Sequence, residues 1–312
     1  MGENTQPSTA AAMANTPPRD KQHDAARQLV EDLRSRKAAD IMRVHVKTIS
    51  SQATVSKALK TLVTCRITGL PVVKNAKFVG IITEKDVLNL TLRKGSLSGS
   101  VQDHMTTRTT TFDVEASVGD VFDCLTQKHY RRVPILRGGK VAGIVSRADL
   151  IRVYLEALQV PPAGPPTSSV VDGPTAGEVM TLGLLTVRPH TSALEAMSLI
   201  VAHGITGLPV VDNSQNLIGI VSEKDFLTLF RDPHVWSRQV ADIMSYDVTA
   251  AVVNTSMLDV CECLANNGFR RVPVVERGKL VGIISRSDLI TFILDNPSVI
   301  TNRTTAPAAG KP

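Results

Sequence analysis

The chain repeats one pattern four times, and this repetition constrains its fold more than any other feature. The segment Ile67–Val73 returns as Ile205–Val211, and Arg131–Pro134 returns as Arg270–Pro273. Each copy closes with an apolar run and then Ser or Thr-x-x-Asp. The closing aspartates lie 63 residues apart within each half and 139 apart between halves: Asp86, Asp149, Asp225 and Asp288. Because a repeat is a folding unit, we expect four units of about 60 residues, made by duplicating a two-unit block.

Each unit predicts the same short helices and strands. In unit one, Val55–Val63 has the spacing of a helix, 70–73 and 79–82 are apolar runs typical of buried strands, and a second helix starts near Asp86. We therefore predict an α/β (α+β) fold in which each unit has a three-stranded sheet and two helices. One such unit buries too little surface to be stable alone. The units of each half are expected to pack sheet against sheet.

Composition shifts indicate the boundaries. The Pro-rich stretch 161–169 divides the chain, and both ends are rich in Ala, Thr and Pro, which is typical of disorder. The predicted organisation is a disordered tail (1–24), a first module (25–160, beginning with a helix over 25–39 and holding repeats at about 38–92 and 101–157), a linker (161–173), a second module (174–296, repeats at about 174–230 and 238–295) and a second disordered tail (297–312).

Charge and cysteine content exclude several classes of protein. A net charge of +6 permits anionic ligands without requiring nucleic acid, and the basic residues lack the interleaved aromatics of a single-strand-binding surface. Cys261-x-Cys263 has no second pair to complete a zinc site, so we expect no metal. No run approaches the roughly 20 apolar residues of a membrane span. The protein is expected to be cytoplasmic, without a membrane or nucleic-acid partner.

The Ser/Thr-x-x-Asp motif has two compatible interpretations. It is a helix capping box, in which the hydroxyl and the acid satisfy the first turn. A carboxylate in that turn can also accept hydrogen bonds from the two vicinal hydroxyls of ribose, as an acid does in dinucleotide-binding folds. We predict that at least two of the four aspartates contact ribose, although not every cleft need be occupied. The hydroxyl residues of the motif are predicted to contact ribose as well: Thr83, Ser146, Ser222 and Ser285.

Three motifs in a fixed order carry a family resemblance. Each unit opens with Asp/Glu-x-Met, continues with Gly-Leu-Pro-Val or Arg-Arg-Val-Pro, and ends with apolar-Gly-apolar-apolar-Ser/Thr-x-x-Asp. This arrangement resembles the CBS-domain family, two repeats of which form a Bateman module. The resemblance covers about residues 38–296, hence two modules, with a layout similar to the gamma subunit of the AMP-activated protein kinase. It implies adenosine-containing ligands (AMP, ADP or ATP) in clefts between paired repeats, and regulation of a partner protein.

The two arginine pairs are the candidate phosphate ligands. They could instead be solvated cations that favour a helix C-terminus. However, they stand directly before the Val-Pro strand entry, and Arg can hold phosphate oxygens with a planar fork. In the kinase gamma subunit a His-Arg pair at the matching position reaches phosphate. The resemblance therefore assigns phosphate contact to Arg131, Arg132, Arg270 and Arg271, with one residue of each pair sufficient.

The adenine pocket has weaker candidates. Thr186 and Thr249 match positions where family members touch the adenine edge. The Gly-Leu-Pro turn before the strand allows a flat ring to approach the backbone, although the turn alone explains its sequence. Its residues are Gly69, Pro71, Gly207 and Pro209.

The repeats, linker and tails leave no segment for a catalytic domain, so we predict a regulatory sensor rather than an enzyme, without cofactors. A ligand-free scaffold and an S-adenosylmethionine-type sensor remain alternatives. The modules could close a disc within one chain or across a homodimer, and the regulated protein is unidentified. Without ligand the arginine pairs are expected to repel one another across the junction, so that bound phosphate draws the halves together and protects the linker from protease.

Overall fold

A computed structural model describes residues 19–94, 97–128, 130–158, 174–228, 234, 237–267 and 269–295. The predicted linker, the predicted C-terminal tail and residues 1–18 lie outside this range. Within it, no helix has the length and apolar character needed to cross a membrane.

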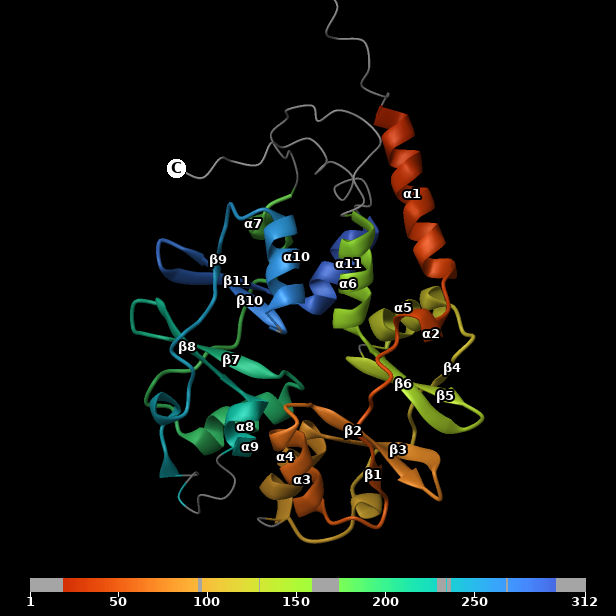
Figure 1. Cartoon of the computed structure of the whole chain (residues 1–312). Helices are drawn as coiled ribbons and strands as arrows, with labels where there is room; N and C mark the ends of the chain where they lie inside the picture. The colour runs from red at the N-terminus through yellow and green to blue at the C-terminus, as the bar shows by residue number, and fades with distance from the viewer. Residues whose placement is uncertain are drawn as a thin grey trace, which may run out of the picture.

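The described residues form a mixed α/β fold with four small sheets, which confirms the predicted class (Figure 1). Unit one, after α1 (Arg19–Ser35) and α2 (Ala38–Ile41), contains β1 (Ile49–Ser50), α3 (Val55–Thr64), β2 (Gly69–Lys74), β3 (Lys77–Thr83) and α4 (Glu84–Lys94). Unit two follows η1 (Val101–Asp103) and contains β4 (Phe112–Asp113), α5 (Val118–Gln127), β5 (Arg132–Arg137), β6 (Lys140–Ser146) and α6 (Arg147–Leu158).

The second module repeats this order. Unit three contains α7 (Ala176–Val179), α8 (Ala193–Ala202), β7 (Gly207–Val211), β8 (Leu217–Ser222) and α9 (Glu223–Thr228). Unit four follows η3 (Val240–Asp242) and contains β9 (Ala251–Val252), α10 (Met257–Asn266), β10 (Arg271–Glu276), β11 (Lys279–Ser285) and α11 (Arg286–Asp295). The first helix, α1, starts at Arg19 and ends at Ser35, earlier at both ends than the predicted 25–39.

Three of the sheets have the predicted three strands. In unit one, β1 pairs parallel to β2, and β2 pairs antiparallel to β3 with Val72 opposite Gly80 and a bulge after Val72. Unit three differs, because β7 and β8 form a two-stranded sheet and a single Val187–Val210 bridge stands where the third strand would be.

A Ser or Thr caps the N-terminus of one helix in every unit, namely α3, α5, α8 and α10. In unit one the Thr54 hydroxyl accepts the Lys57 backbone N–H, which satisfies one of the free donors of the first turn. The matching caps in the other units are Ser117, Ser192 and Ser256. The fourfold sequence repeat therefore places an equivalent N-cap residue in each of the four units.

The opening methionine of each unit interlocks with the glycine of its partner unit. Gly143 of β6 lies against Met42, and Gly219 of β8 lies so close to Met244 that a Cβ would come within 2.6 Å of its Sδ. A Cβ on Gly80 of β3 would come within 2.6 Å of the Thr106 carbonyl oxygen. Two motifs that are far apart in sequence thus meet across the pair, and this explains why units occur in twos.

We expect Gly80→Ala to lower the free energy of unfolding by about 1–3 kcal/mol, because the added methyl meets backbone that cannot easily move. Gly69→Ala is the matched control, since its Cβ would meet its nearest atom, Thr83 Cγ2, at an ordinary 3.4 Å. Urea unfolding measures both. Equal losses would show that the close approach at Gly80 is not what requires glycine.

Within each module the two hairpins also touch. The Phe78 N–H donates to the Gly139 carbonyl at 3.0 Å, and the Leu217 N–H donates to the Gly278 carbonyl at 3.1 Å. An isolated β-bridge also joins Ile81 to Thr106 in the first module. These contacts pair units one and two, and units three and four.

The hydrophobic cores, by contrast, run between the modules. One core joins units two and four through α5, α6, α10 and α11, and it buries Phe122 and Tyr154 together with Leu264. The other joins units one and three through α3, α4, α8 and α9, and it buries Leu62 and Phe226. The pairing of units within a half therefore buries only part of the apolar surface. The remaining apolar faces are buried where helices of one module pack against helices of the other.

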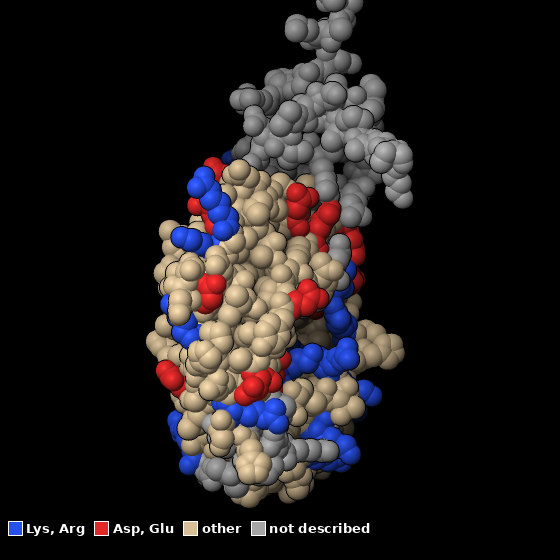
Figure 2. Space-filling model, turned by 90° about the vertical axis from the view of Figure 1, so that its left-hand side faces the viewer, with Lys and Arg blue, Asp and Glu red and all other residues tan. Residues whose placement is uncertain are grey.

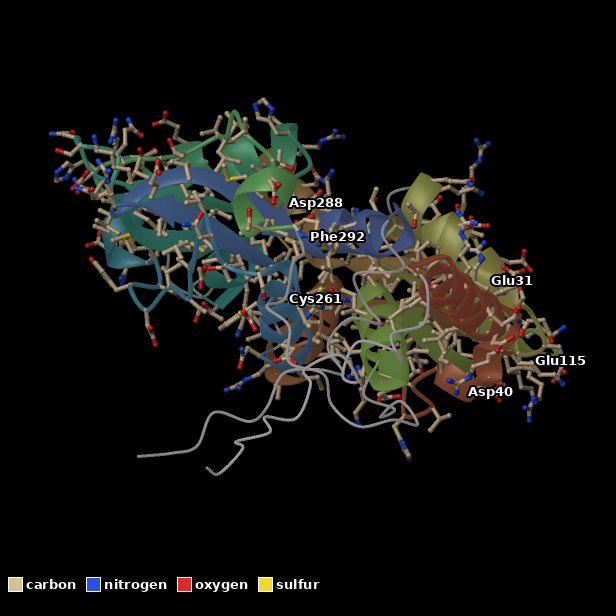
Figure 3. All side chains as sticks on the ribbon, turned by 90° about the horizontal axis from the view of Figure 1, so that it is seen from above. Glu31, Asp40, Glu115, Cys261, Asp288 and Phe292 are labelled. Atoms are coloured by element: carbon tan, nitrogen blue, oxygen red, sulfur yellow. The ribbon has the colours of Figure 1, made fainter. Side chains whose placement is uncertain are left out.

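Consequently the two modules of one chain pack side by side. In Figure 1, α5, α6, α10 and α11 lie in the upper part of the molecule and α3, α4, α8 and α9 in the lower part. Seen from above, Cys261 and Phe292 lie near the middle, whereas Glu31, Asp40 and Glu115 lie at the end of the first module (Figure 3). The junction between modules is thus an interior feature of the chain.

Candidate functional site

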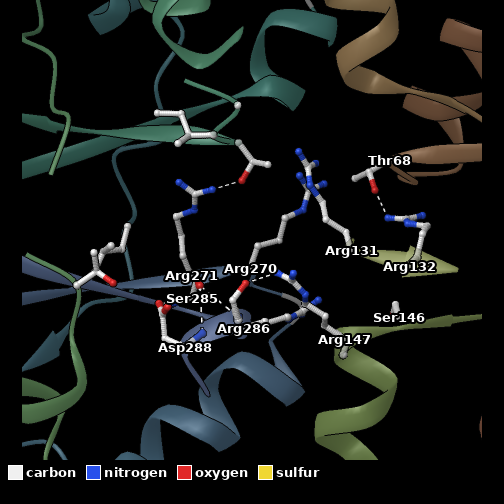
Figure 4. Close-up of a pocket in the computed structure, with 17 residues that line it drawn as sticks. Thr68, Arg131, Arg132, Ser146, Arg147, Arg270, Arg271, Ser285, Arg286 and Asp288 are labelled. Atoms are coloured by element: carbon white, nitrogen blue, oxygen red, sulfur yellow. Dashed lines mark hydrogen bonds between the residues drawn. The ribbon is translucent and has the colours of Figure 1, made fainter. Parts of the chain in front are cut away.

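Six arginines converge at the junction between the modules. They come from the starts of β5 and β10 and from the first residues of α6 and α11, and they line a cavity of about 430 Å³ (Figure 4). The six are Arg131, Arg132, Arg147, Arg270, Arg271 and Arg286. The structure therefore brings the two predicted arginine pairs together and adds two arginines that the sequence analysis had missed.

The first arginine of each pair forms an ion pair with the opposite module. Arg131 binds the Glu223 carboxylate, with 3.0 Å between Nη1 and Oε2. Arg270 contacts Glu84 at 3.4 Å and Glu223 at 3.7 Å. Both glutamates are buried, and burial raises the pKa of Glu84 while nearby Arg270 lowers it. These first arginines join the two halves of the protein.

The second arginine of each pair has neutral hydrogen-bond partners. Arg132 donates to the Thr68 hydroxyl, and Arg271 donates to the Thr206 hydroxyl and, at 2.7 Å, to the Gly207 carbonyl. Burial, and then the charge of Arg270, lower the pKa of Arg132 and Arg271 to about 10. A buried cation without a carboxylate hydrogen bond is stabilised by any anion that reaches it.

Arg147 and Arg286 add to this positive potential. Each donates to a backbone carbonyl at the end of a neighbouring helix, Arg147 to Leu125 at 2.9 Å and Arg286 to Leu264 at 3.0 Å. In the part of the chain that the structure describes, Arg286 Nε is buried and has no hydrogen-bond partner. Burial and Arg270 lower the pKa of Arg286 to about 10. The junction thus holds more cationic than anionic side chains.

The missed residues share one sequence position. Glu84 and Glu223 follow the Thr or Ser of the closing motif in units one and three, where Arg147 and Arg286 stand in units two and four. Aligning the four repeats would have revealed this alternation of charge. The expected repulsion between the unliganded arginine pairs is present, because, in addition to burial, the charge of Arg270 lowers the pKa of Arg132 and the charge of Arg131 lowers the pKa of Arg271. The sequence analysis had missed the buried Glu223 and Glu84, whose ion pairs with Arg131 and Arg270 partly offset this repulsion.

All four closing aspartates form the acidic half of a capping box. One carboxylate oxygen, Oδ2, accepts the backbone N–H of the preceding Ser or Thr at 2.7–2.9 Å. Three of the hydroxyls, those of Thr83, Ser146 and Ser222, also donate to this oxygen, so they hold the acid in place. Three of the four hydroxyls predicted to contact ribose therefore already donate to the acid, whereas the Ser285 hydroxyl accepts the Ser287 backbone N–H at 3.2 Å.

The other carboxylate oxygen distinguishes the sites. Among described residues, no hydrogen bond reaches Oδ1 of Asp86 or Asp225, and burial raises the pKa of both acids. Asp149 is different. Its Oδ1 accepts from Arg43 Nε at 2.7 Å and from Arg152 Nη2 at 2.9 Å. Burial alone would raise the pKa of Asp149, but the Ser146 and Arg43 hydrogen bonds together hold it below its usual value.

A second cavity, also of about 430 Å³, opens beside Asp86. Its walls include Thr106, Thr109 and Thr110 of the segment after Met105. It shares Thr68, Arg131, Arg132 and Gly204 with the junction cavity, so the two cavities are neighbours with a common wall, and Asp86, Arg131 and Arg132 line the same cavity. Asp288, with Ser285, lines the junction cavity itself.

The predicted adenine residues are less well placed. Thr186 and Thr249 do not line either cavity, although Thr110, which like Thr249 stands five residues after its methionine, lines the one beside Asp86. Gly69 and Gly207 begin β2 and β7, the strands that also hold Pro71 and Pro209. A Cβ on Gly207 would come within 2.8 Å of the Val221 carbonyl oxygen, so close strand packing explains this glycine.

On the face shown in Figure 2, charged side chains of both signs surround a broad uncharged area. No continuous basic stripe crosses that face. A sequence-independent nucleic-acid surface would need such a stripe to neutralise successive phosphates.

Comparison with known proteins identifies the repeats. The sequence profile of the CBS domain matches residues 38–93, 101–156, 176–232 and 240–295. Protein MJ1225 of Methanocaldococcus jannaschii is 24% identical over 192 residues, which are 61% of this chain and 69% of that protein. Its crystal structure, described as that of a proposed archaeal homologue of the AMP-activated kinase gamma subunit, superposes with a TM-score of 0.73 at 21% identity, covering 83% of this chain and all of the other.

Two further relatives match single modules. CBSX2 of Arabidopsis thaliana is 31% identical over 153 residues, 39% of this chain and 64% of that protein. A crystal structure of CBSX2 in complex with AMP gives a TM-score of 0.37 at 34% identity, with 39% and 98% of the two chains covered. Inosine-5'-monophosphate dehydrogenase of Methanocaldococcus jannaschii is 32% identical over 116 residues, which make up 37% of this chain and only 23% of the enzyme.

Proposed function

Because this chain belongs to the CBS-domain family and carries four copies of the domain, we propose that it is a non-catalytic sensor of adenosine phosphates that regulates another protein. The observation that carries the proposal is the cavity beside Asp86, which Arg131 and Arg132 also line and which adjoins the junction cavity. It combines a carboxylate for vicinal hydroxyls with buried guanidinium groups for phosphate.

Each part of the ligand has a candidate partner. The unused Oδ1 of Asp86 or Asp225 can accept the 2′ and 3′ hydroxyls of ribose. Phosphate oxygens can accept from Arg132 and Arg271, whose hydrogen-bond partners among the residues that the structure describes are neutral. Charge-assisted hydrogen bonds of this kind are about twice as strong as neutral ones. The threonines beside Asp86 are placed to line the base end of the same cavity.

Two findings support a regulatory rather than an enzymatic role. The CBS repeats cover most of the described chain, and the similarity to inosine-5'-monophosphate dehydrogenase extends over less than a quarter of that enzyme. The junction supplies a route for a signal, since phosphate arriving beside Arg131 and Arg270 competes with Glu223 and Glu84 for the same guanidinium groups. A ligand shifts such an equilibrium only by its difference in affinity for the two arrangements.

The test is thermal unfolding of nucleotide-free protein with AMP, ADP or ATP. AMP is the first probe because the relative CBSX2 has been crystallised with it. Ligand at about 100 times its dissociation constant should stabilise the fold by about 2.7 kcal/mol. Small-angle scattering with saturating ligand should change as well. Unchanged melting at millimolar AMP, ADP and ATP would refute the sensor, and unchanged scattering with proven binding would leave a binder that does not signal.

The same titration separates the two alternatives. S-adenosylmethionine carries a sulfonium cation and no phosphate, so the excess of arginine at the junction disfavours it. Stabilisation by S-adenosylmethionine but not by AMP would favour that class of sensor. An absence of stabilisation by every adenosine compound would favour a scaffold whose clefts serve only protein contacts.

A further inference from the structure

One of the four closing aspartates, Asp149, meets two arginines that the others lack. Arg43 follows the opening methionine of unit one, where Thr106, Thr181 and Ser245 follow the corresponding methionines. Each of these four residues bridges by its backbone to the strand that leads into one closing aspartate, and for Arg43 that aspartate is Asp149. The position three residues after the aspartate is Arg152 in this cleft and is Asn89, Thr228 or Thr291 in the others.

These two arginines hydrogen-bond to the carboxylate oxygen, Oδ1, that no described residue reaches in Asp86 or Asp225. Arg43 Nε and Arg152 Nη2 donate to Asp149 Oδ1 at 2.7 and 2.9 Å. Ser146 donates to Oδ2 from its backbone and its hydroxyl. The Asp149 side chain is 1% exposed, whereas the Arg43 and Arg152 side chains are 59% and 43% exposed. The acid is therefore covered by side chains that reach it from the solvent side.

The two arginine N–H groups donate two hydrogen bonds to this carboxylate, the same number that the two vicinal hydroxyls of ribose would donate. The arginine bonds are charge-assisted, so a neutral diol cannot replace them without loss. The lowered pKa of Asp149, against the raised pKa of Asp86 and Asp225, agrees with a carboxylate already paired with cations.

Building on the proposed function, we propose that Arg43 and Arg152 are built-in occupants of the ribose position at Asp149 and close this cleft to nucleotides. They are specificity-determining residues of the sensor, which binds ligand only at the remaining clefts. The asymmetry distinguishes the modules, since the equivalent cleft of the second module has Thr181 and Thr291 beside Asp288.

The test counts AMP molecules bound per chain by equilibrium dialysis at saturation. We expect Arg43→Thr/Arg152→Thr to bind one more AMP than the unmodified protein, because these are the residues of the second module. The backbone should tolerate the change, since Thr181 makes with Ile283 the same paired bridge, at 2.9 and 3.1 Å, that Arg43 makes with Ile144. Arg43→Gln/Arg152→Gln serves as a second variant of similar length, should the first unfold in a melting check.

Two controls identify the cleft. Adding Asp149→Asn to the double variant should return the count to that of the unmodified protein. The reciprocal Thr181→Arg/Thr291→Arg should close the Asp288 cleft and lower the count by one. A folded Arg43→Thr/Arg152→Thr protein that binds no more AMP than the original would overturn the inference while leaving the sensor intact. If neither protein binds AMP, the proposed function fails and this inference with it.

Discussion

Replacing Arg270 with alanine is expected to lower the free energy of unfolding by about 3–5 kcal/mol. Arg270 is the ion-pair partner of Glu84, and it also contacts Glu223. Both glutamates are almost fully buried, with 5% and 1% of the side chain exposed. Removing the cation leaves the buried Glu84 carboxylate without its ion-pair partner, whereas Glu223 keeps its ion pair with Arg131. Denaturant unfolding at neutral pH measures the loss.

The effect should depend on pH in a direction that the structure fixes. Burial already raises the pKa of Glu84, and Arg270 opposes that rise. Without Arg270 the folded-state pKa of Glu84 rises further above its unfolded value. A group with a raised folded pKa adds stability below its unfolded pKa and loses it as the pH rises through the folded pKa. The Arg270→Ala protein should therefore lose less stability at about pH 5 than at about pH 8.

Two further variants show whether the junction charge is the cause. Arg270→Ala combined with Glu84→Gln should recover much of the loss, because the orphaned charge is gone. Arg137→Ala removes an exposed arginine at the end of β5 and should stay within about 0.5 kcal/mol of the original. A double variant as unstable as Arg270→Ala alone would mean that lost packing, rather than an unpaired carboxylate, causes the effect.

Arg271→Ala should weaken AMP and ATP binding by about 10- to 100-fold while leaving adenosine nearly unchanged. A hydrogen bond to a charged group contributes about 1.5–3 kcal/mol, and each 1.4 kcal/mol is tenfold in affinity. Arg271 is the better candidate of its pair, since Arg270 is held by Glu84 whereas, among the described residues, Arg271 bonds to the neutral Thr206 and Gly207. Calorimetric titration with the three ligands measures the difference.

The matched control is again Arg137→Ala, which removes the same charge away from the junction and should change none of the three affinities. An Arg271→Ala protein that loses affinity for adenosine as much as for AMP would contradict phosphate contact. It would indicate instead that Arg271 holds Thr206 and the start of β7 in place.

Local patterns were sufficient for much of this fold. The repeat spacing predicted four units, and the Gly- and Pro-bounded apolar runs predicted the hairpins that the structure shows. The capping half of the Ser/Thr-x-x-Asp interpretation needs only residues three apart, so its hydrogen bonds at Asp86 and Asp225 were accessible from sequence. Such features depend on neighbours along the chain and not on how units pack.

The rest depends on contacts between distant residues. Glu84 and Arg270 are 186 positions apart, and Arg43 and Asp149 are 106 apart. Neither pair follows from periodicity or composition, because any exposed Arg has the same local signature as one that crosses a junction. The cores shared between modules were hidden for the same reason, since an amphipathic helix does not specify which partner covers it.

The cores that join units one with three and two with four make the chain a fused version of a symmetric dimer. Two separate copies of a two-unit protein would have to present identical surfaces to each other and identical clefts to solvent. When the two halves are covalently fused, neither their contact surfaces nor their clefts need to be identical. The packing of the halves against each other also no longer depends on protein concentration. Each half can then accept substitutions that the other does not share. Arg43 in one half and Thr181 in the other are such a pair. In a homodimer both subunits would carry the same residue at this position.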